Sequence, residues 1–406
     1  MRQLKCGLLN ASLNSNNMGC NALCYSAIQL LEAAAQSADL KLEYILFDHH
    51  SKMALEFYPE LSRTSIAIVP PIISIRSKAK ILLTQKSWAP LIDFGKTIES
   101  CDLFLDLAGG DSFSDIYGLP RLRGIFAFHR HIMKKQKPLI FMPQTIGPFT
   151  SEESRKIAAA SLSYASCIFV RDPLSRQEAL RFTEEIKIRS TIDMAFHMGY
   201  VPAKTSASGI KRIGVNPSGL LWNNGYTGNN EFGLKCSFKD LILTIIKSLT
   251  RPGLQIELLG HDVQGPFYDL GDDYRVCKAI QREIPECSVA PFFYTPTEAK
   301  SYVSGLDMLI GARMHCCIAA YSSGVPVYPL AYSRKFRGLF RDELRYPYGA
   351  ELTSESTTTV IANLQHALYE LPRIRSEMPG RVEALKTYKA AFLEDLKTNV
   401  LARFVT

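Results

Sequence analysis

Short apolar runs alternate with amphipathic helical patterns along most of the chain, and this alternation is the strongest constraint on its fold. Apolar runs bounded by polar or glycine-rich stretches are typical of strands buried in a parallel sheet. The sequence therefore predicts an α/β, doubly wound architecture, in which helices cross over between parallel strands. We expect strands at Lys5–Leu9, Leu42–Phe47, Leu103–Leu107, Leu139–Met142, Cys167–Val170, Arg212–Asn216, Gln255–Leu259, Ser288–Ala290, Met308–Ile310 and Val325–Leu330.

The length of the chain, 406 residues, predicts two domains rather than one. Periodicity is lost near Gly199–Gly209, which predicts a linker there. We expect an N-terminal Rossmann-like domain over residues 1–200, a C-terminal Rossmann-like domain over 201–375, and a helical tail over 376–406. The tail pattern is interrupted around Pro379–Gly380. If the carboxyl strand edges of the two domains face each other, polar loops after the strands line one cleft.

Composition narrows the classes of partner. A net charge of +8 suits phosphorylated substrates or an acidic surface. No basic run is interleaved with aromatic residues, so nucleic acid is not an expected partner. No apolar run reaches the roughly 18 residues of a membrane span. Ten scattered cysteines, without a CxxC pair or an N-terminal signal pattern, indicate reduced thiols in a cytoplasmic protein.

Two further clusters have simple explanations. Asp48, His49 and His50 have no partner at ligand spacing, so they predict an ordinary loop and no metal site. The segment Arg334–Arg345 interleaves basic residues with phenylalanine and leucine. It fits a solvated helix face beside the cleft, and it also fits a patch that contacts a membrane surface. A peripheral membrane contact therefore stays open.

The segment Gly311–Lys335 contains the most informative polar residues. An apolar run stops at Gly311, Arg313 and His315 open a short helical pattern, and Lys335 follows the next apolar run. Because adjacent parallel strands end at the same sheet edge, these side chains are expected to lie together. Two cations and a titratable imidazole at a helix N-terminus predict an anion site with a proton carrier beside it.

The chain resembles the polysaccharide pyruvyl transferases in the order and spacing of five motifs: NNMGCNAL, DLAGGDSFSD, MPQTIGPF, VRDPLS and GARMHCCIAAYSSGVPVYPLAYSRK. The resemblance covers about Lys5 to Leu339. It implies a fold similar to the two-domain GT-B glycosyltransferases. It also implies transfer of a pyruvyl group from phosphoenolpyruvate onto two hydroxyls of a glycan sugar in bacterial surface polysaccharide synthesis. The products would be a cyclic ketal and phosphate. No cofactor is implied besides this donor, and the glycan acceptor is either lipid-linked or free.

The resemblance also implies a donor site. By motif, Arg171, His315 and Lys335 occupy its positions, with Arg313 close by. Phosphoenolpyruvate carries a phosphate and a carboxylate, so several cations suit it, and arginine suits bidentate contacts with oxygen. His315 suits the general-acid step that protonates the enol methylene.

The acceptor side is expected in the N-terminal half. Asp111 or Asp115 is the candidate to accept the proton of the attacking hydroxyl, although either also fits a structural turn. Asp111 stands where the family often has a third glycine, and Cys20 stands where an aspartate often follows the early N-x-G motif. Further substrate contacts are expected from polar or glycine residues after the strands, namely Asn17, Gly109, Gly110 and Gln144.

Two other functions stay open at this point. One is a nucleotide-sugar glycosyltransferase on a similar fold, although no motif for a base and ribose is found. The other is a non-catalytic, glycan-binding member of the same family. Trp222 and Tyr226, in a loop after a strand, fit either stacking on a sugar ring or ordinary packing.

Overall fold

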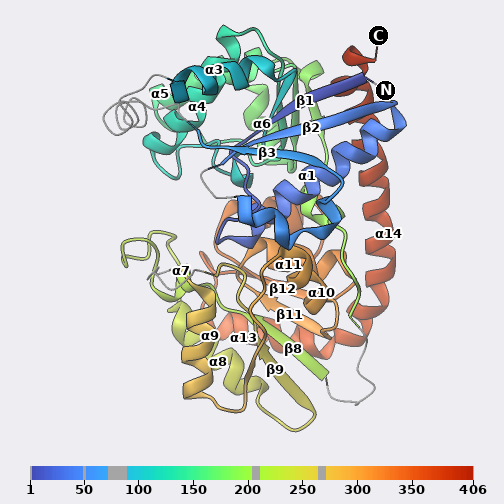
Figure 1. Ribbon diagram of the computed structural model, residues 1–406. Helices are drawn as coiled ribbons and strands as arrows, with labels where there is room; N and C mark the ends of the chain where they lie inside the picture. Colours follow the sequence, from blue (N-terminus) through green and yellow to red (C-terminus); the bar gives the residue numbers. More distant parts are fainter. Residues whose placement is uncertain (1, 49–51, 72–88, 204–210, 264–270, 406) are drawn as a thin grey trace. The chain divides into compact units, whose positions relative to one another are not determined.

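The computed structural model describes residues 2–48, 52–71, 89–203, 211–263 and 271–405, in two compact units (Figure 1). His49 and His50, and most of the predicted linker, lie outside these ranges. Two segments differ from a simple N-terminal and C-terminal division, because Asn16–Ala22 joins the C-terminal half and the end of the chain joins the N-terminal half. Unit 1 comprises Met1–Ser15, Leu23–Met194 and Tyr388–Thr406, and unit 2 comprises Asn16–Ala22 and Ala195–Thr387.

Unit 1 is built on a parallel sheet with the strand order β3-β2-β1-β4-β5-β6-β7 in its described residues. The order reverses between β1 and β4, and ligands of doubly wound domains bind beside such a switch point, at the carboxyl ends of the strands. The strands are β1 (Arg2–Leu9), β2 (Leu40–Phe47), β3 (Ser65–Val69), β4 (Leu103–Asp106), β5 (Leu139–Gln144), β6 (Cys167–Val170) and β7 (Ile188–Ser190).

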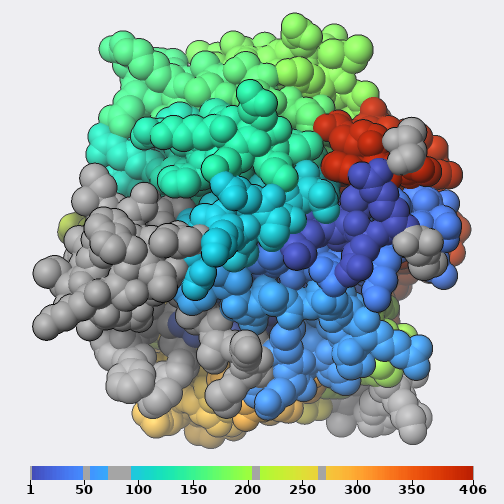
Figure 2. All heavy atoms as spheres, turned by 45° about the horizontal axis from the view of Figure 1, so that its top comes forward, coloured from blue at the N-terminus to red at the C-terminus, as the bar shows by residue number. Residues whose placement is uncertain are grey.

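Helices cover the unit 1 sheet, and several phenylalanines pack together with isoleucines in the core beneath them. Phe113 packs edge-on against Phe141 and Phe149, with ring centroids 4.9 and 5.3 Å apart. The C-terminal residues lie beside the N-terminal strand in both views (Figures 1 and 2), and Phe392 packs at 4.9 Å against Phe169 of β6. The helices are α1 (Met18–Ser37), α3 (Ala89–Ser100), α4 (Leu119–Lys134), α5 (Glu152–Tyr164), α6 (Pro173–Leu180) and α14 (Leu371–Asp395). Both α1 and α14 have their first residues in unit 2.

Unit 2 repeats the architecture with the strand order β10-β9-β8-β11-β12-β13 in its described residues. Its switch point lies between β8 and β11. The strands are β8 (Lys211–Asn216), β9 (Leu254–Leu258), β10 (Ser288–Val289), β11 (Met308–Gly311), β12 (Val327–Ala331) and β13 (Ala350–Glu351).

Right-handed crossovers place α8 (Phe238–Leu249) and α9 (Asp273–Glu283) on one face of the unit 2 sheet. They place α10 (Pro296–Val303) and α11 (Met314–Ser322) on the other face, where these two helices pack together (Figure 1). The doubly wound prediction is therefore confirmed for both halves. The remaining helices of this unit are α7 (Gly219–Trp222), α12 (Arg334–Phe336), the π-helix Arg337–Glu343 and α13 (Thr357–Tyr369).

The predicted break in the tail helix is wrong, because α14 continues through Pro379 and Gly380. An internal proline costs about 3 kcal/mol in an isolated helix. Burial of the apolar side chains of α14 offsets that cost, since Ile374 and Met378 are almost fully buried in unit 2. The prediction also omitted β3, β7 and β13. Strands β7 and β13 are very short, so their apolar pattern is too brief to detect.

Candidate active site

The carboxylate of Asp273, fully buried at the start of α9, joins three loops at the carboxyl edge of the unit 2 sheet. It accepts hydrogen bonds from the backbone N–H groups of Gly219 at 2.8 Å, His261 at 3.1 Å and Asp262 at 3.0 Å. It also accepts hydrogen bonds from Nε and Nη2 of Arg313, at 3.2 and 2.8 Å. One carboxylate therefore fixes the loops that follow β8, β9 and β11. Sequence reasoning missed Asp273, because nothing local distinguishes it from the helix-capping Asp272 beside it.

Arg313 lies just before α11, and its guanidinium is committed to neighbouring acidic groups and a carbonyl. It forms ion pairs with Asp273 at 2.8 Å and Asp262 at 3.2 Å, and donates to the carbonyl of Gly271 at 2.8 Å. Its backbone N–H donates to Asn216 Oδ1 at 2.9 Å. Burial opposes the charge, but the two carboxylates outweigh it and raise the pKa of Arg313 above its ordinary value. Arg313 thus positions the turn from β11 into α11.

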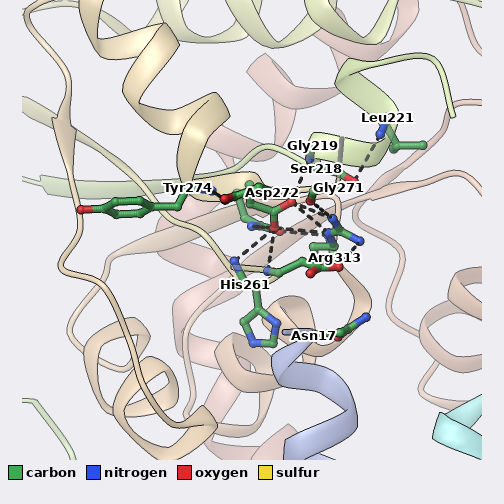
Figure 3. A network of polar contacts seen from close by, with 12 residues as sticks. Asn17, Ser218, Gly219, Leu221, His261, Gly271, Asp272, Tyr274 and Arg313 are labelled. Carbon is green, nitrogen blue, oxygen red and sulfur yellow. Dashed lines mark hydrogen bonds and ion pairs between the residues drawn. The ribbon is translucent and has the colours of Figure 1, made fainter. Parts of the chain in front are cut away.

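His261 is buried beneath the same network, directly after β9 (Figure 3). Burial, together with charge repulsion from His315 and Arg313, lowers the pKa of its imidazole to about 3. His261 is therefore neutral near pH 7 and acts as a structural neighbour of the site.

The segment Asn16–Ala22 brings the start of α1 against His315. Its backbone pairs with the loop after β9, since Met18 N–H donates to the His261 carbonyl at 3.1 Å and an antiparallel bridge joins Asn17 to Asp262. Asn17 Oδ1 accepts the N–H of Gly19 at 2.9 Å. A Cβ added to Gly19 would lie 2.2 Å from His315 Nδ1. The early glycine therefore permits direct packing of the α1 backbone on the imidazole.

Lys335 lies in α12, after the strand next to β11, as the sequence predicted. Its Nζ lies 5.8 Å from the ring centroid of Tyr332, which is itself only 7% exposed. Arg313, His315, Lys335 and Asn17 therefore all belong to unit 2. The first three follow β11 and β12 of its sheet, and Asn17 pairs with Asp262 in the loop after β9. The side chain of Arg313, the residue before α11, does not cap the helix that carries His315.

Arg171 belongs to unit 1 and is nearly fully buried, at 2% exposed. It forms an ion pair with the buried Asp193, and its Nε and Nη2 donate to Thr145 Oγ1 at 3.1 and 2.8 Å. This arrangement matches a buried structural ion pair. A role for Arg171 as a substrate-binding cation stays a prediction.

The two candidate carboxylates of unit 1 differ in their surroundings. Asp115 Oδ2 accepts the Thr150 and Ser151 N–H groups at 2.6 and 3.1 Å and the Ser154 hydroxyl at 2.7 Å, at the start of α5. Burial raises the pKa of Asp115, but these hydrogen bonds outweigh it and lower the pKa below its ordinary value. Asp111 Oδ2 accepts the Tyr117 hydroxyl at 2.9 Å. The Asp115 carboxylate therefore holds the loop before α5 in place.

The predicted Gly109, Gly110 and Gln144 surround the end of β4 at the unit 1 switch point. Gly109 and Gly110 both have positive φ, and the Gly109 N–H donates to the Asn10 carbonyl at 2.9 Å. Gln144 is fully buried, and its Nε2 donates to the Asp106 carbonyl at 2.7 Å. Gln144 therefore supports the loop rather than presenting a side chain at the surface.

Asp106 also contacts His129, and this pair extends to Ser161 at 2.9 Å. All three side chains are fully buried, so the arrangement is a structural network rather than a hydrolytic triad.

In the described ranges, no cluster of three or more histidine, cysteine or acidic residues is arranged to hold a metal ion. All ten cysteines are described and are free thiols.

Comparison with known proteins identifies the family. The family model for polysaccharide pyruvyl transferase matches residues 17–334, most of the chain. The chain belongs to the polysaccharide pyruvyl transferase family. The resemblance predicted from the motifs is thereby confirmed. A search of curated proteins gave no match.

Solved structures with the same fold are glycosyltransferases and epimerases of the GT-B type. A Listeria monocytogenes protein described as a UDP-N-acetylglucosamine 2-epimerase has a TM-score of 0.58 and 11% identity over 98% of this chain and 96% of its own. The Neisseria meningitidis UDP-GlcNAc 2-epimerase has a TM-score of 0.54 and 13% identity, and the match covers 97% of this chain and 100% of its own. The glycotransferase of kitacinnamycin has a TM-score of 0.52 and 11% identity, and the match covers 98% of this chain and 99% of its own. At these identities the likeness shows the fold alone, and it confirms the GT-B-like prediction for this pyruvyl transferase family member.

Proposed function

We propose that this protein moves a pyruvyl group from phosphoenolpyruvate onto two hydroxyls of a glycan sugar and releases phosphate. Membership of the family supports the transferase class. The observation that carries the proposal is the arrangement of His315 and Lys335, which follow two adjacent strands beside the unit 2 switch point. In doubly wound domains, ligands bind at this edge.

In the proposed reaction, His315 gives a proton to the methylene carbon of phosphoenolpyruvate, and C2 becomes electrophilic. One glycan hydroxyl adds to C2, and phosphate leaves as its bond to C2 breaks. The second hydroxyl then closes the ring on C2. Of the two hydroxyl protons, one replaces the proton given by His315 and the other leaves on phosphate.

Lys335 and the first backbone amides of α11 are the proposed partners of the donor's phosphate and carboxylate. Arg313 is proposed to act indirectly, since its donors already engage Asp273, Asp262 and Gly271. It would position the turn that carries His315. Direct contact between Arg171 and the donor would require its buried pair with Asp193 to open, so we place it in a supporting role.

For the proton acceptor, we propose Asp111 rather than Asp115. Several hydrogen bonds stabilise the Asp115 carboxylate and lower its pKa, which makes it a weaker base. Asp111 lies in the loop after β4, and its Oδ2 accepts a hydrogen bond from the Tyr117 hydroxyl at 2.9 Å. An Asp111→Asn variant should lose more transfer rate than Asp115→Asn at equal amounts of folded protein.

The test is phosphate release from phosphoenolpyruvate with a panel of free and lipid-linked glycans, with mass analysis of the glycan for a pyruvate ketal. His315→Gln should lower the acceptor-dependent rate by about 10²-fold or more. His366→Gln, at an exposed histidine of α13, is the matched control and should leave the rate unchanged. Release that persists in His315→Gln would remove His315 from the mechanism. No release with any glycan, together with saturable binding of a nucleotide sugar, would favour a glycosyltransferase instead.

The acceptor's carrier and the site of reaction are also proposals. A phosphoenolpyruvate donor suits a cytoplasmic location. No described helix is long and apolar enough to cross a membrane. In the segment Arg334–Arg345, Phe336, Leu339 and Phe340 are buried, so a membrane contact there would depend mainly on the exposed arginines of the segment. Binding to anionic vesicles that disappears in Arg337→Gln with Arg341→Gln would support a lipid-linked acceptor, and absence of vesicle binding by the wild type would exclude this contact.

A further inference from the structure

An exposed tyrosine projects from the loop that follows β8 and α7, at the switch-point edge of unit 2. Tyr226 is 63% exposed, and its ring lies 6.2 Å from that of Phe232 in the same loop. Trp222, the other aromatic residue here, is half-buried with Lys239 Nζ 5.5 Å above its ring. Tyr226 is therefore the aromatic side chain of this loop that presents its surface to solvent.

A continuous row of rings connects Tyr226 to the candidate active site. Phe232 packs on Tyr332 with centroids 5.0 Å apart and planes at 75°. Tyr332 is the ring above which Lys335 Nζ lies, at 5.8 Å. Two consecutive ring contacts thus separate the exposed Tyr226 from the ring beside Lys335, a span that a short oligosaccharide can bridge.

The loop is held in shape by its own side chains. Glu231 Oε1 accepts the Thr227 N–H at 2.5 Å, and the Asn230 amide both accepts from the Leu234 N–H and donates to its carbonyl. Gly225 has φ +96°, and a Cβ there would lie 1.6 Å from Glu231 Oε2. Because the loop is already ordered, less conformational entropy is lost when a ligand binds to Tyr226.

We propose that Tyr226 is a stacking platform for a sugar of the acceptor glycan, one or two residues away from the sugar that receives the pyruvyl group. The inference deepens the proposed function and rests on it, because it makes the acceptor an oligosaccharide. Tyrosine offers a large rigid surface at low entropic cost, and the apolar face of a sugar ring packs well on it. Asn224 and Asn229 are exposed in the same loop, and amide side chains can both donate to and accept from sugar hydroxyls.

The test compares Tyr226→Ala and Tyr226→Phe with the wild type on monosaccharide glycosides and on di- to tetrasaccharides that end in the same reacting sugar. Tyr226→Ala should raise KM for the longer acceptors about tenfold, with kcat and the KM for phosphoenolpyruvate unchanged. Tyr226→Phe should restore KM, because it keeps the ring. Tyr369→Ala, at an 81% exposed tyrosine of α13, should change nothing. Equal effects on short and long acceptors, or no effect, would overturn the inference.

A binding experiment separates this inference from the reaction itself. Binding of fluorescently labelled protein to an array of the same glycans, without phosphoenolpyruvate, should weaken in Tyr226→Ala and persist in Tyr369→Ala. Glycan binding that depends on Tyr226 without any pyruvyl transfer would reject the proposed reaction and keep the platform. Pyruvyl transfer to long and short acceptors that is the same in Tyr226→Ala and the wild type would reject the platform and keep the reaction.

Discussion

Replacing Gly19 by alanine tests the contact between α1 and the proposed catalytic imidazole. The added Cβ would lie 2.2 Å from His315 Nδ1 and 2.7 Å from His315 Cγ. Gly19 lies in the first turn of α1, and its φ is not in the left-handed region, so alanine is compatible with its backbone. Alanine is favoured over glycine in helices by about 1 kcal/mol, so the helix itself should not be weakened.

The expected loss of activity follows from the displacement that the contact requires. Non-bonded carbon contacts are comfortable at about 3.5 Å or more, so the imidazole or the helix must move by roughly 1 Å. A misplacement of about 1 Å at a catalytic group costs on the order of 10²-fold in rate, or about 2.7 kcal/mol in the activation free energy. Gly19→Ala should therefore lower kcat strongly while the protein stays folded.

The assay is acceptor-dependent phosphate release, measured beside the melting temperature of each variant. Gly124→Ala is the matched control, because Gly124 lies inside α4 and a Cβ there would have no neighbour within 4 Å. Gly124→Ala should keep full activity. If Gly19→Ala retained more than half of the wild-type rate, the placement of His315 against α1 would not matter for catalysis.

Three further predictions concern stability. Asp273→Asn should lower the free energy of unfolding by about 3 kcal/mol or more, because it leaves the buried Arg313 without its main partner. A loss below about 1 kcal/mol in urea unfolding would contradict that role. Asp115→Asn should destabilise the protein at pH 7. Because the folded pKa of Asp115 is lowered, the difference in unfolding free energy between wild type and variant should shrink as the pH falls below about 4. A difference that does not change with pH would show that the Asp115 carboxylate does not stabilise the fold. His261 has a folded pKa of about 3, so the unfolded chain binds its proton first and stability falls as the pH drops below about 6.5. His261→Asn should remove up to about 2 kcal/mol of the loss between pH 7 and pH 5, and an unchanged pH profile would show that His261 titrates normally.

The strands were the most predictable part of the fold. The prediction for β6 matches the observed Cys167–Val170, and that for β11 is short by one residue, because buried strands are continuous apolar runs. The tail helix was predicted less well. The local rule for Pro379 overestimated its effect, since packing of α14 compensates for one missing hydrogen bond.

The candidate site was predictable only where strand order alone brings residues together. Arg313, His315 and Lys335 follow adjacent strands, and sequence reasoning placed them on one edge. The contact of Gly19 with His315 joins remote parts of the chain, and so does the convergence of three loops on Asp273. Neither leaves a local pattern.

The sequence by itself determined most of the strands, the doubly wound class and the family, because periodicity, turn residues and motif spacing are properties of neighbouring residues. Only the tertiary structure decided which charges are committed to ion pairs and which aromatic ring faces solvent. Arg171 and Tyr226 show the difference: the first is buried against Asp193, and the second stands exposed on a folded loop. Burial and ion pairing depend on segments that are distant in the chain. The free energy of placing a charged or aromatic side chain is set by this tertiary environment far more than by its sequence neighbours.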